Sequence, residues 1–245
     1  MVKRKSGVRR GIAFIGGEGP LAVRRRELVD EAGRADTTCT VPAVLADAPL
    51  IVAADSGLVA AEEAGIAVDW VIGDMDSLDD VRRLDKYPPD RVRRYGHDKD
   101  YTDTELALAL LWEQGCNETW LIGGGGGRTD HLLAIRALFE RERTPDRWVT
   151  AREDIRCLRE GDVFSIERGG EGGSREQVGA DTGSAAVSVF PLGIGPWQAE
   201  SRGLKWPLDA LSWDRGFFGI SNTAPDGGFE IRVRRGRFLL MLLGK

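Results

Sequence analysis

The sequence predicts an α/β protein in two parts. Residues 1–156 form an N-terminal three-layer α/β domain with a mostly parallel sheet, and residues 157–245 form a C-terminal all-β sandwich or barrel. Up to about residue 150, short apolar runs alternate with amphipathic stretches, as in strands joined by crossover helices. Beyond about residue 156 only short strand-like runs remain, separated by Gly, Pro, Asn and Asp.

The apolar runs of the first part predict buried strands at residues 11–15, 50–54, 70–72, 92–95 and 119–122. The amphipathic stretches between them predict helices at residues 21–32, 58–64, 103–114 and 131–143. The second part predicts strands at residues 163–166, 185–190, 217–220, 229–233 and 238–243. Residues 168–183, rich in Gly, Ser and charge, are expected to be an exposed loop.

The composition is that of a globular protein, with 42% hydrophobic and 30% charged residues. A net charge of −5 gives no support for nucleic-acid binding, and no apolar run predicts a signal peptide or a membrane span. The cysteines Cys39, Cys116 and Cys157 are odd in number and lack metal-ligand spacing. We therefore expect reduced thiols in a cytoplasmic protein.

Three stretches at predicted strand ends carry the chemistry: residues 73–77, 98–103 and 123–131. In parallel α/β sheets ligands bind beyond the carboxyl ends of the strands, so stretches far apart in sequence can converge there. Carboxylates gathered at such an edge repel one another unless a cation lies between them. Oxygen ligands favour Mg²⁺, which usually arrives with substrate phosphates. The sequence thus indicates metal-dependent phosphoryl or pyrophosphoryl transfer.

In the first stretch one residue separates Asp74 from Asp76. On an extended strand both carboxylates would point to the same side and could bind a metal. The alternative is a capped turn, with Ser77 and Asp80 starting a helix at Leu78, but that explains neither of the two carboxylates.

The second stretch contains Thr102 and Glu105, which form a capping box, and Asp103 in the first helical turn. The position of Asp103 therefore fits a role in stabilising the helix start and a role in catalysis equally well. Asp98 and Asp100 precede the helix and are harder to explain structurally. Lys99 either contacts a phosphate or offsets the carboxylate charge.

The third stretch has five glycines, residues 123–127, but no Walker A or dinucleotide pattern follows. Its N–H groups could approach an anion closely, and Arg128 would add donors suited to phosphate. A flexible turn is the alternative, which the nearby Asp130 makes less attractive. His131 is expected to pack or to cap the helix rather than to act as a base, and His97 is left without a role.

In the second part, Trp206 and the Ser221-Asn222 pair could hold a flat heteroaromatic ligand by stacking and hydrogen bonding. The alternative is a core tryptophan beside a Ser-Asn turn.

In this order the motifs resemble those of the thiamine pyrophosphokinase family, over nearly the whole chain from residue 11 to residue 243. The matching elements are Ala54-Asp55-Ser56-Gly57, Gly73-Asp74-Met75-Asp76-Ser77, Asp98-Lys99-Asp100-Tyr101-Thr102-Asp103, Gly123-Gly124-x-Gly126-Gly127-Arg128-x-Asp130-His131, Ser188-Val189-Phe190-Pro191-Leu192-Gly193, Gly203-Leu204-Lys205-Trp206-Pro207-Leu208 and Ile220-Ser221-Asn222-Thr223. Ser56 stands where many relatives have glycine, and Ile135 where the family often has asparagine.

The resemblance implies Mg²⁺-dependent transfer of the terminal diphosphate of ATP to the hydroxyl of thiamine, giving AMP. It also implies a homodimer with active sites shared between subunits. By motif position, the catalytic residues would be Asp74, Asp76, Asp100, Asp103 and Asp130, the first four of them metal ligands. ATP or its phosphates would be bound by Asp55, Lys99 and Arg128, and thiamine by Trp206, Ser221 and Asn222. We nominate Asp100 or Asp103 to accept the proton of the hydroxyl.

Two other functions fit parts of the pattern. One is a pyrophosphokinase that acts on another heteroaromatic alcohol, such as a hydroxymethylpterin. The other is a nucleotide- or thiamine-binding sensor without turnover. The Trp206 and Ser221-Asn222 elements argue against the first, and the carboxylate set argues against the second.

Overall fold

The computed structural model describes residues 7–20, 50–166, 186–214, 216–225 and 228–243. The helix expected at residues 21–32, the loop expected at 168–183 and Cys39 lie outside this part of the chain. The strands are β1 (Arg10–Phe14), β2 (Leu50–Ala54), β3 (Trp70–Gly73), β4 (Val92–Arg94), β5 (Glu118–Ile122), β6 (Arg147–Val149), β7 (Glu153–Arg159), β8 (Val163–Ile166), β9 (Val187–Leu192), β10 (Gln198–Arg202), β11 (Gly219–Asn222), β12 (Phe229–Arg235) and β13 (Arg237–Leu243). The α-helices are α3 (Gly57–Glu63), α4 (Asp103–Glu113) and α5 (Thr129–Leu138), and the 3₁₀ helices are η1 (Val81–Lys86), η2 (Pro89–Arg91) and η3 (Leu208–Ala210).

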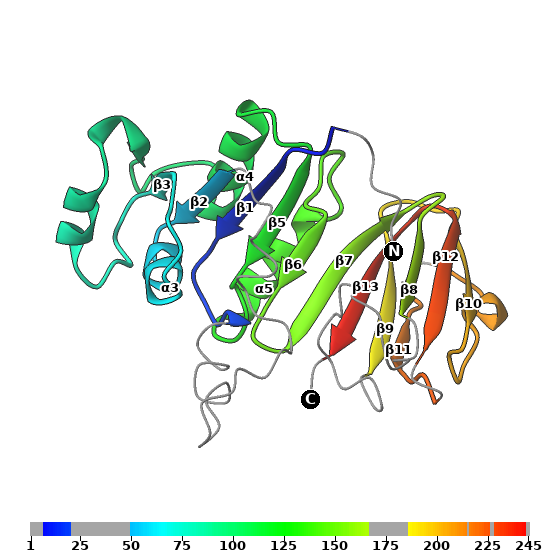
Figure 1. The fold of residues 1–245 in the computed structure, drawn as a ribbon. Helices are drawn as coiled ribbons and strands as arrows, with labels where there is room; N and C mark the ends of the chain where they lie inside the picture. The colour runs from blue at the N-terminus through cyan, green and yellow to red at the C-terminus, as the bar shows by residue number, and fades with distance from the viewer. Residues whose placement is uncertain (1–6, 21–49, 167–185, 215, 226–227, 244–245) are drawn as a thin grey trace, which may run out of the picture.

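One ten-stranded sheet runs through both halves of the chain, in the order β11-β9-β13-β7-β6-β5-β1-β2-β3-β4. The six strands from β6 to β4 pair in parallel, whereas β7, β13, β9 and β11 pair antiparallel. Figure 1 shows this sheet crossing the molecule, with the second sheet, β10-β12-β8, beside its antiparallel part. The expected mixed α/β fold with a mostly parallel region is confirmed. The expected boundary after residue 156 falls within β7.

Alternate residues of the parallel strands pack against different helices, because successive side chains point to opposite faces. Ala13 belongs to the hydrophobic cluster that contains the buried residues of α4 and α5. Ile12 and Phe14 belong to the cluster that contains Ala61 of α3. Helices therefore cover both faces of the parallel region, which explains why its strands read as continuous apolar runs.

A separate cluster joins the two sheets of the second half. Leu240 of β13 and Ile231 of β12 are both fully buried within it, and Phe164 and Phe229 meet there with ring centroids 6.0 Å apart. Strands β7, β9 and β13 contribute to this cluster from one side and β8, β10 and β12 from the other.

Strands β6 and β7 were missed by the sequence prediction because charged residues interrupt their apolar positions. Arg147 is only 8% exposed. Its guanidinium pairs with Asp154 at 2.7 Å, and Asp154 also accepts from Arg156 at 3.0 Å. Pairing of opposite charges lets such residues enter the sheet, but no apolar pattern signals it. β10, which alternates Ala199 with polar residues at an outer edge, was missed as well.

Of three expected helical details, one is confirmed and two differ. The capping box of Thr102 and Glu105 is confirmed at the start of α4. The helix start at Leu78 is wrong, because η1 begins at Val81 and Asp80 caps it by accepting from the N–H of Arg82. Helix α5 begins two residues earlier than expected and ends at Leu138, and the next residue, Phe139, stacks on Trp148 with ring centroids 6.5 Å apart.

The candidate active site

The candidate site lies at the carboxyl edge of the parallel strands. From β1 the chain proceeds outward through β2, β3 and β4, and then returns to β5 on the other side of β1. Strands are thus added on one side of β1 first and on its other side from β5 onward. Such a switch in strand order, here between β1 and β5, is the point where ligands bind in open α/β sheets. The loops that follow β5, β1, β2, β3 and β4 succeed one another along this edge. The three predicted stretches, residues 73–77, 98–103 and 123–131, lie where the chain leaves β3, β4 and β5.

Asp55, Asp74 and Asp103 come together, with ligand oxygens within 4.8 Å of one another. Asp55 follows β2 and is only 8% exposed, and its N–H donates to the carbonyl of Ile72 on β3 at 2.9 Å. The prediction assigned it to ATP rather than to the metal. Its position directly after a buried strand was the signal that could have placed it in the carboxylate group.

Gly73 is the residue that lets these carboxylates approach. It ends β3 with a φ of +142°, and a Cβ at this position would lie 3.1 Å from Asp103 Oδ1 and 3.2 Å from Asp55 Cβ. A side chain here would therefore intrude between the two carboxylates. The backbone conformation independently favours glycine.

Asp74 and Asp76 also lie close together, but for another reason than the one expected. The strand ends at Gly73, and Met75 has a φ of +67°, so the segment is a turn rather than an extended strand. Met75 is buried under α3 and η1. Asp74 is half-buried, and the exposed Asp76 forms a second group with Asp74 and His97. The Nδ1 atom of His97 is 3.3 Å from Asp74 Oδ2 and 3.7 Å from Asp76 Oδ2.

Lys99 bridges two members of the carboxylate group. Its Nζ donates to Asp74 Oδ2 at 2.8 Å and forms an ion pair with Asp103 Oδ1 at 2.9 Å. The hydrogen bond from Lys99 is the main reason why the pKa of Asp74 is lowered. Burial raises the pKa of Asp103 and outweighs the opposing effect of Lys99. Burial alone would lower the pKa of Lys99, but the two carboxylates raise it.

The residues present fit a hard divalent cation. Asp55 Oδ1 and Asp74 Oδ1 are buried and have no hydrogen-bond partner. Buried, unpaired carboxylate oxygens cost free energy, so their presence indicates a ligand. An oxygen-only donor set of this kind suits Mg²⁺.

Asp100 lies apart from this group. Its side chain is exposed, and among the described residues it belongs to neither set of potential metal ligands. The reason is local: Asp103 is the first residue of α4 and faces β3, whereas Asp100 precedes the Thr102 cap in an irregular segment. Of the two residues nominated to accept the proton, Asp103 is therefore the one within the carboxylate group.

The glycine run is tied to the loop after β1. Gly123, Gly124 and Gly125 donate their N–H groups to the carbonyls of Val149, Gly16 and Glu18 at 3.0, 2.9 and 2.9 Å. These N–H groups were expected to approach an anion, but the Gly123 N–H binds β6, and the N–H groups of Gly124 and Gly125 bind the loop after β1. The exposed Gly126 and Gly127 are the part of the run open to a ligand.

Arg128 is exposed and binds Asp130 through both ends of its guanidinium, at 3.1 and 2.6 Å. Asp130, in the first turn of α5, also accepts from the N–H of the adjacent His131 at 3.0 Å. Arg128 and Asp130 thus face each other and lie outside the carboxylate groups. Ile135, where relatives often carry asparagine, packs in the core between sheet and helices.

The predicted heteroaromatic-binding residues do gather in the second half. Asn222 is 5% exposed and contacts the main chain of Trp206, whose side chain is 53% exposed. Lys205 Nζ lies 4.6 Å from the centroid of the indole ring. The N–H of Ser221 donates to Ser188 Oγ at 3.2 Å, and Ser221 has a φ of +55°. The indole ring of Trp206 therefore lies on the surface rather than in the core.

The two groups of residues are far apart within one chain. Seven strands lie between β11, which carries Ser221 and Asn222, and β3, which leads into Asp74. At about 4.8 Å per strand this corresponds to roughly 38 Å across the sheet.

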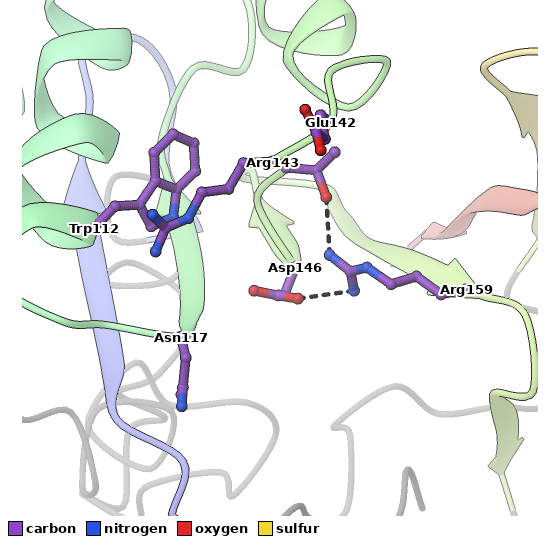
Figure 2. Close-up of a pocket in the computed structure, with 7 residues that line it drawn as sticks. Trp112, Asn117, Glu142, Arg143, Asp146 and Arg159 are labelled. Carbon is purple, nitrogen blue, oxygen red and sulfur yellow. Dashed lines mark hydrogen bonds and ion pairs between the residues drawn. The ribbon is translucent and has the colours of Figure 1, made fainter.

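A hollow of about 230 Å³ at the opposite, amino edge of β5 is a different kind of site. Figure 2 shows the guanidinium of Arg143 beside Trp112, and Arg159 paired with Asp146. Arg159 also donates to Thr144, Arg143 donates to the carbonyl of Cys116, and Asp146 accepts from the N–H of Thr119. These polar groups are engaged with one another and brace the strand ends, so we assign the hollow a structural role.

Comparisons with known proteins agree with the site. Residues 41–147 match the family described as thiamin pyrophosphokinase, catalytic domain. The thiamine pyrophosphokinase of Bacillus subtilis (strain 168) is 28% identical over 165 residues, which are 65% of this chain and 71% of that protein.

Solved structures show the same fold over almost the whole chain. The thiamin pyrophosphokinase of Geobacillus thermodenitrificans superposes with a TM-score of 0.64 at 24% identity, covering 96% of this chain and 98% of the other. The enzyme from Bacillus subtilis gives 0.66 at 22% identity, covering 96% and 99%, and that from Candida albicans gives 0.65 at 14%, covering 97% and 90%. Together the domain match, the curated relative and the shared fold confirm the resemblance carried by the motifs: residues 41–147 of this chain match the catalytic domain of the thiamine pyrophosphokinase family.

Proposed function

We propose that this chain transfers the diphosphate group of ATP to the hydroxyl of thiamine, giving thiamine diphosphate and AMP. This is the reaction of the family whose catalytic domain residues 41–147 match. The observation that supports it best is the convergence of Asp55, Asp74 and Asp103 at the carboxyl edge of the parallel strands. This edge also carries the loops after β1 and β5, where the strand order switches.

In this reaction the thiamine oxygen attacks the β-phosphorus of ATP, the bond from that phosphorus to the α-bridging oxygen breaks, and AMP leaves. Asp55, Asp74 and Asp103 would hold Mg²⁺, whose chemistry when bound is to neutralise charge on the phosphate oxygens. Asp76 lies beside Asp74 on the exposed side of the site and is proposed to contact the metal ion through a water molecule. Asp103 accepts the proton of the hydroxyl, because its pKa is raised by burial and a base with a pKa nearer to neutral is more effective.

Lys99, Arg128 and Asp130 are assigned to the phosphate side of the site. Lys99 lies within the carboxylate group, and Arg128 stands at the end of the glycine run. Arg128 would exchange its exposed pairing with Asp130 for the phosphates, since exposed ion pairs contribute little. Asp100 remains the alternative base proposed from the sequence.

The acceptor is proposed to bind to Trp206, Ser221 and Asn222, so that residues 1–156 handle ATP and residues 157–245, an all-β sandwich, handle thiamine. Because these groups are roughly 38 Å apart across one sheet, a second copy of the chain must supply the acceptor residues. An exposed apolar surface around β11, the outermost strand of the ten-stranded sheet, supports a homodimer; its residues are Trp206, Leu211, Phe217, Phe218 and Ile220.

We place this enzyme in the cytoplasm, consistent with free, buried thiols at Cys116 and Cys157. Among the described residues, no helix combines the length and apolar character needed to span a bilayer.

The proposal is tested by incubating the chain with ATP, Mg²⁺ and thiamine and separating the nucleotide products. AMP and thiamine diphosphate should form in equal amounts, and only when thiamine is present. Formation of ADP, or AMP that does not depend on thiamine, would refute it. A parallel assay with a hydroxymethylpterin should show no turnover, and turnover with that compound alone would favour the other acceptor.

A further inference from the structure

Lys99 occupies an unusual position for a cation. It precedes α4 by four residues, at the helix end where the dipole favours anions. Its side chain is nevertheless only 14% exposed and forms ion pairs with both Asp74 and Asp103. An exposed lysine gains little from such pairs. The burial of Lys99 therefore indicates that the cluster of Asp55, Asp74 and Asp103 needs a positive charge beside it.

The three clustered carboxylates carry more negative charge than their surroundings balance. Three carboxylates whose oxygens lie within 4.8 Å repel one another strongly in a partly buried setting. Lys99 supplies one positive charge and uses Asp74 Oδ2 and Asp103 Oδ1. Asp55 Oδ1, Asp74 Oδ1 and Asp103 Oδ1 are buried without a hydrogen-bond partner, and of these three oxygens only Asp103 Oδ1 has the ion pair with Lys99. With all three carboxylates ionised, a formal charge of about −2 remains, which a divalent cation balances.

We propose that Lys99 is a built-in counter-ion that weakens the binding of a bare divalent cation to Asp55, Asp74 and Asp103, so that the metal is held firmly only together with the phosphates of ATP. Lys99 is thus a positioning residue that acts through the carboxylates. The phosphates bring the additional negative charge that the lysine has offset. This inference rests on the metal-dependent function proposed above and adds that the metal and the nucleotide bind as a unit.

The test is a titration with Mn²⁺, followed by electron paramagnetic resonance, in the absence of ATP and thiamine. Removing the charge in Lys99→Met should tighten Mn²⁺ binding about tenfold, since one unit charge is lost beside the ligands. Lys99→Arg keeps the charge and should bind within about twofold of the wild type. Lys86→Met is the matched control, because Lys86 pairs with Glu62 at 2.9 Å on the exposed surface and should leave the affinity unchanged.

Thermal unfolding gives a second readout that does not depend on activity. Without metal, Lys99→Met should melt at a lower temperature than the wild type, and added Mg²⁺ should raise its melting temperature more than it raises that of the wild type. Unchanged or weaker Mn²⁺ binding by Lys99→Met would overturn the proposal. So would failure of both Lys99→Met and Lys99→Gln to fold at every Mg²⁺ concentration, because Lys99 would then be a structural requirement.

The outcome is separable from the proposed reaction. The titration contains neither nucleotide nor thiamine, so a failed AMP assay leaves its result intact. The converse outcome is that the wild type forms AMP while Lys99→Met binds bare Mn²⁺ no more tightly than the wild type. That result would support the proposed reaction and refute the counter-ion role of Lys99.

Discussion

The side-chain amide of Asn222 holds the main chain of Trp206 at two points. Its Nδ2 donates to the Trp206 carbonyl at 2.6 Å, and its Oδ1 accepts from the Trp206 N–H at 3.1 Å. The same Oδ1 also accepts from the N–H of Thr223 at 2.9 Å. Asn222 is buried, whereas the indole that it positions is exposed. The amide therefore fixes the place at which a flat ligand could stack.

We expect Asn222→Ala to raise the KM for thiamine about tenfold, equivalent to about 1.4 kcal/mol of lost binding. The buried main-chain groups of Trp206 would lose their partners, so the free energy of unfolding should also fall by about 1–3 kcal/mol. Steady-state kinetics and urea unfolding measure the two effects. Asn117→Ala removes a comparable amide at the amino edge, where Asn117 Oδ1 accepts from Arg9 at 2.9 Å, and should leave the KM unchanged. An equal KM effect in both variants would contradict a role for the clamp in binding.

Asp103→Asn should lower kcat by about a hundredfold or more, the scale seen when a group that stabilises the transition state is lost. Asp100→Asn should stay within about threefold of the wild type, because exposed residues away from a site tolerate substitution. The two variants remove the same charge three positions apart, so each controls for the other in the AMP assay. A large loss in Asp100→Asn would restore Asp100 as the catalytic carboxylate.

Mixing two inactive variants tests whether active sites are shared between subunits. Asp103→Asn lacks part of the carboxylate group and Trp206→Ala lacks the acceptor ring. In a symmetric dimer with shared sites, each mixed dimer contains one intact site. After subunit exchange, an equimolar mixture should recover about a quarter of the wild-type activity. Two variants that both affect the carboxylates, Asp74→Asn and Asp103→Asn, should recover none. Recovery in neither mixture would place both groups of residues in a single chain.

The glycine run should be sensitive to substitution at its buried end. Gly123 has a φ of +108°, and a Cβ there would lie 2.3 Å from the carbonyl oxygen of Ile15. Gly127 has a φ of +67° and no atom within 4 Å of such a Cβ. We expect Gly127→Ala to cost about 1–2 kcal/mol for the left-handed conformation alone. Gly123→Ala should cost about 1–3 kcal/mol more because the main chain at Ile15, just after β1, must move. Equal losses in chemical denaturation would show that the loops do not constrain each other.

The ion pairs of Asp154 should make stability depend on acid. Burial would raise the pKa of Asp154, but Arg156 and Arg147 outweigh it and hold the pKa below its usual range. Because the folded pKa is lower than the unfolded one, the stabilisation is complete above the unfolded pKa, near 4, and is lost as the pH falls through the folded pKa.

Asp154→Asn leaves the buried guanidinium of Arg147 and the partly buried guanidinium of Arg156 without their carboxylate, and should cost about 3 kcal/mol at pH 7. The gap between variant and wild type should be constant above about pH 5 and narrow below about pH 4. Urea unfolding across this range measures it. Asp90→Asn is the control, since Asp90 and Arg91 are exposed and 3.8 Å apart. A gap that does not change with pH would assign the loss to packing rather than charge.

The sequence by itself determined the strands of the parallel region except β6, because strands covered on both faces leave apolar runs such as residues 50–54, which match β2 without change. It also determined the Thr102 capping box, a contact between residues three apart. The motifs in their order identified the family. These features are local, or they are carried by residue type and spacing along the chain.

Only the tertiary structure decided which carboxylates meet. Asp55 joins Asp74 and Asp103 because β2 and β3 are neighbours and Gly73 leaves room, whereas Asp100, three residues from Asp103, stays outside. The charged strands β6 and β7 were equally invisible, since the ion pair of Arg147 with Asp154 forms only when the strands pair. Contacts between distant residues depend on strand order and on the charges that each side chain meets, and neither is written in the local sequence.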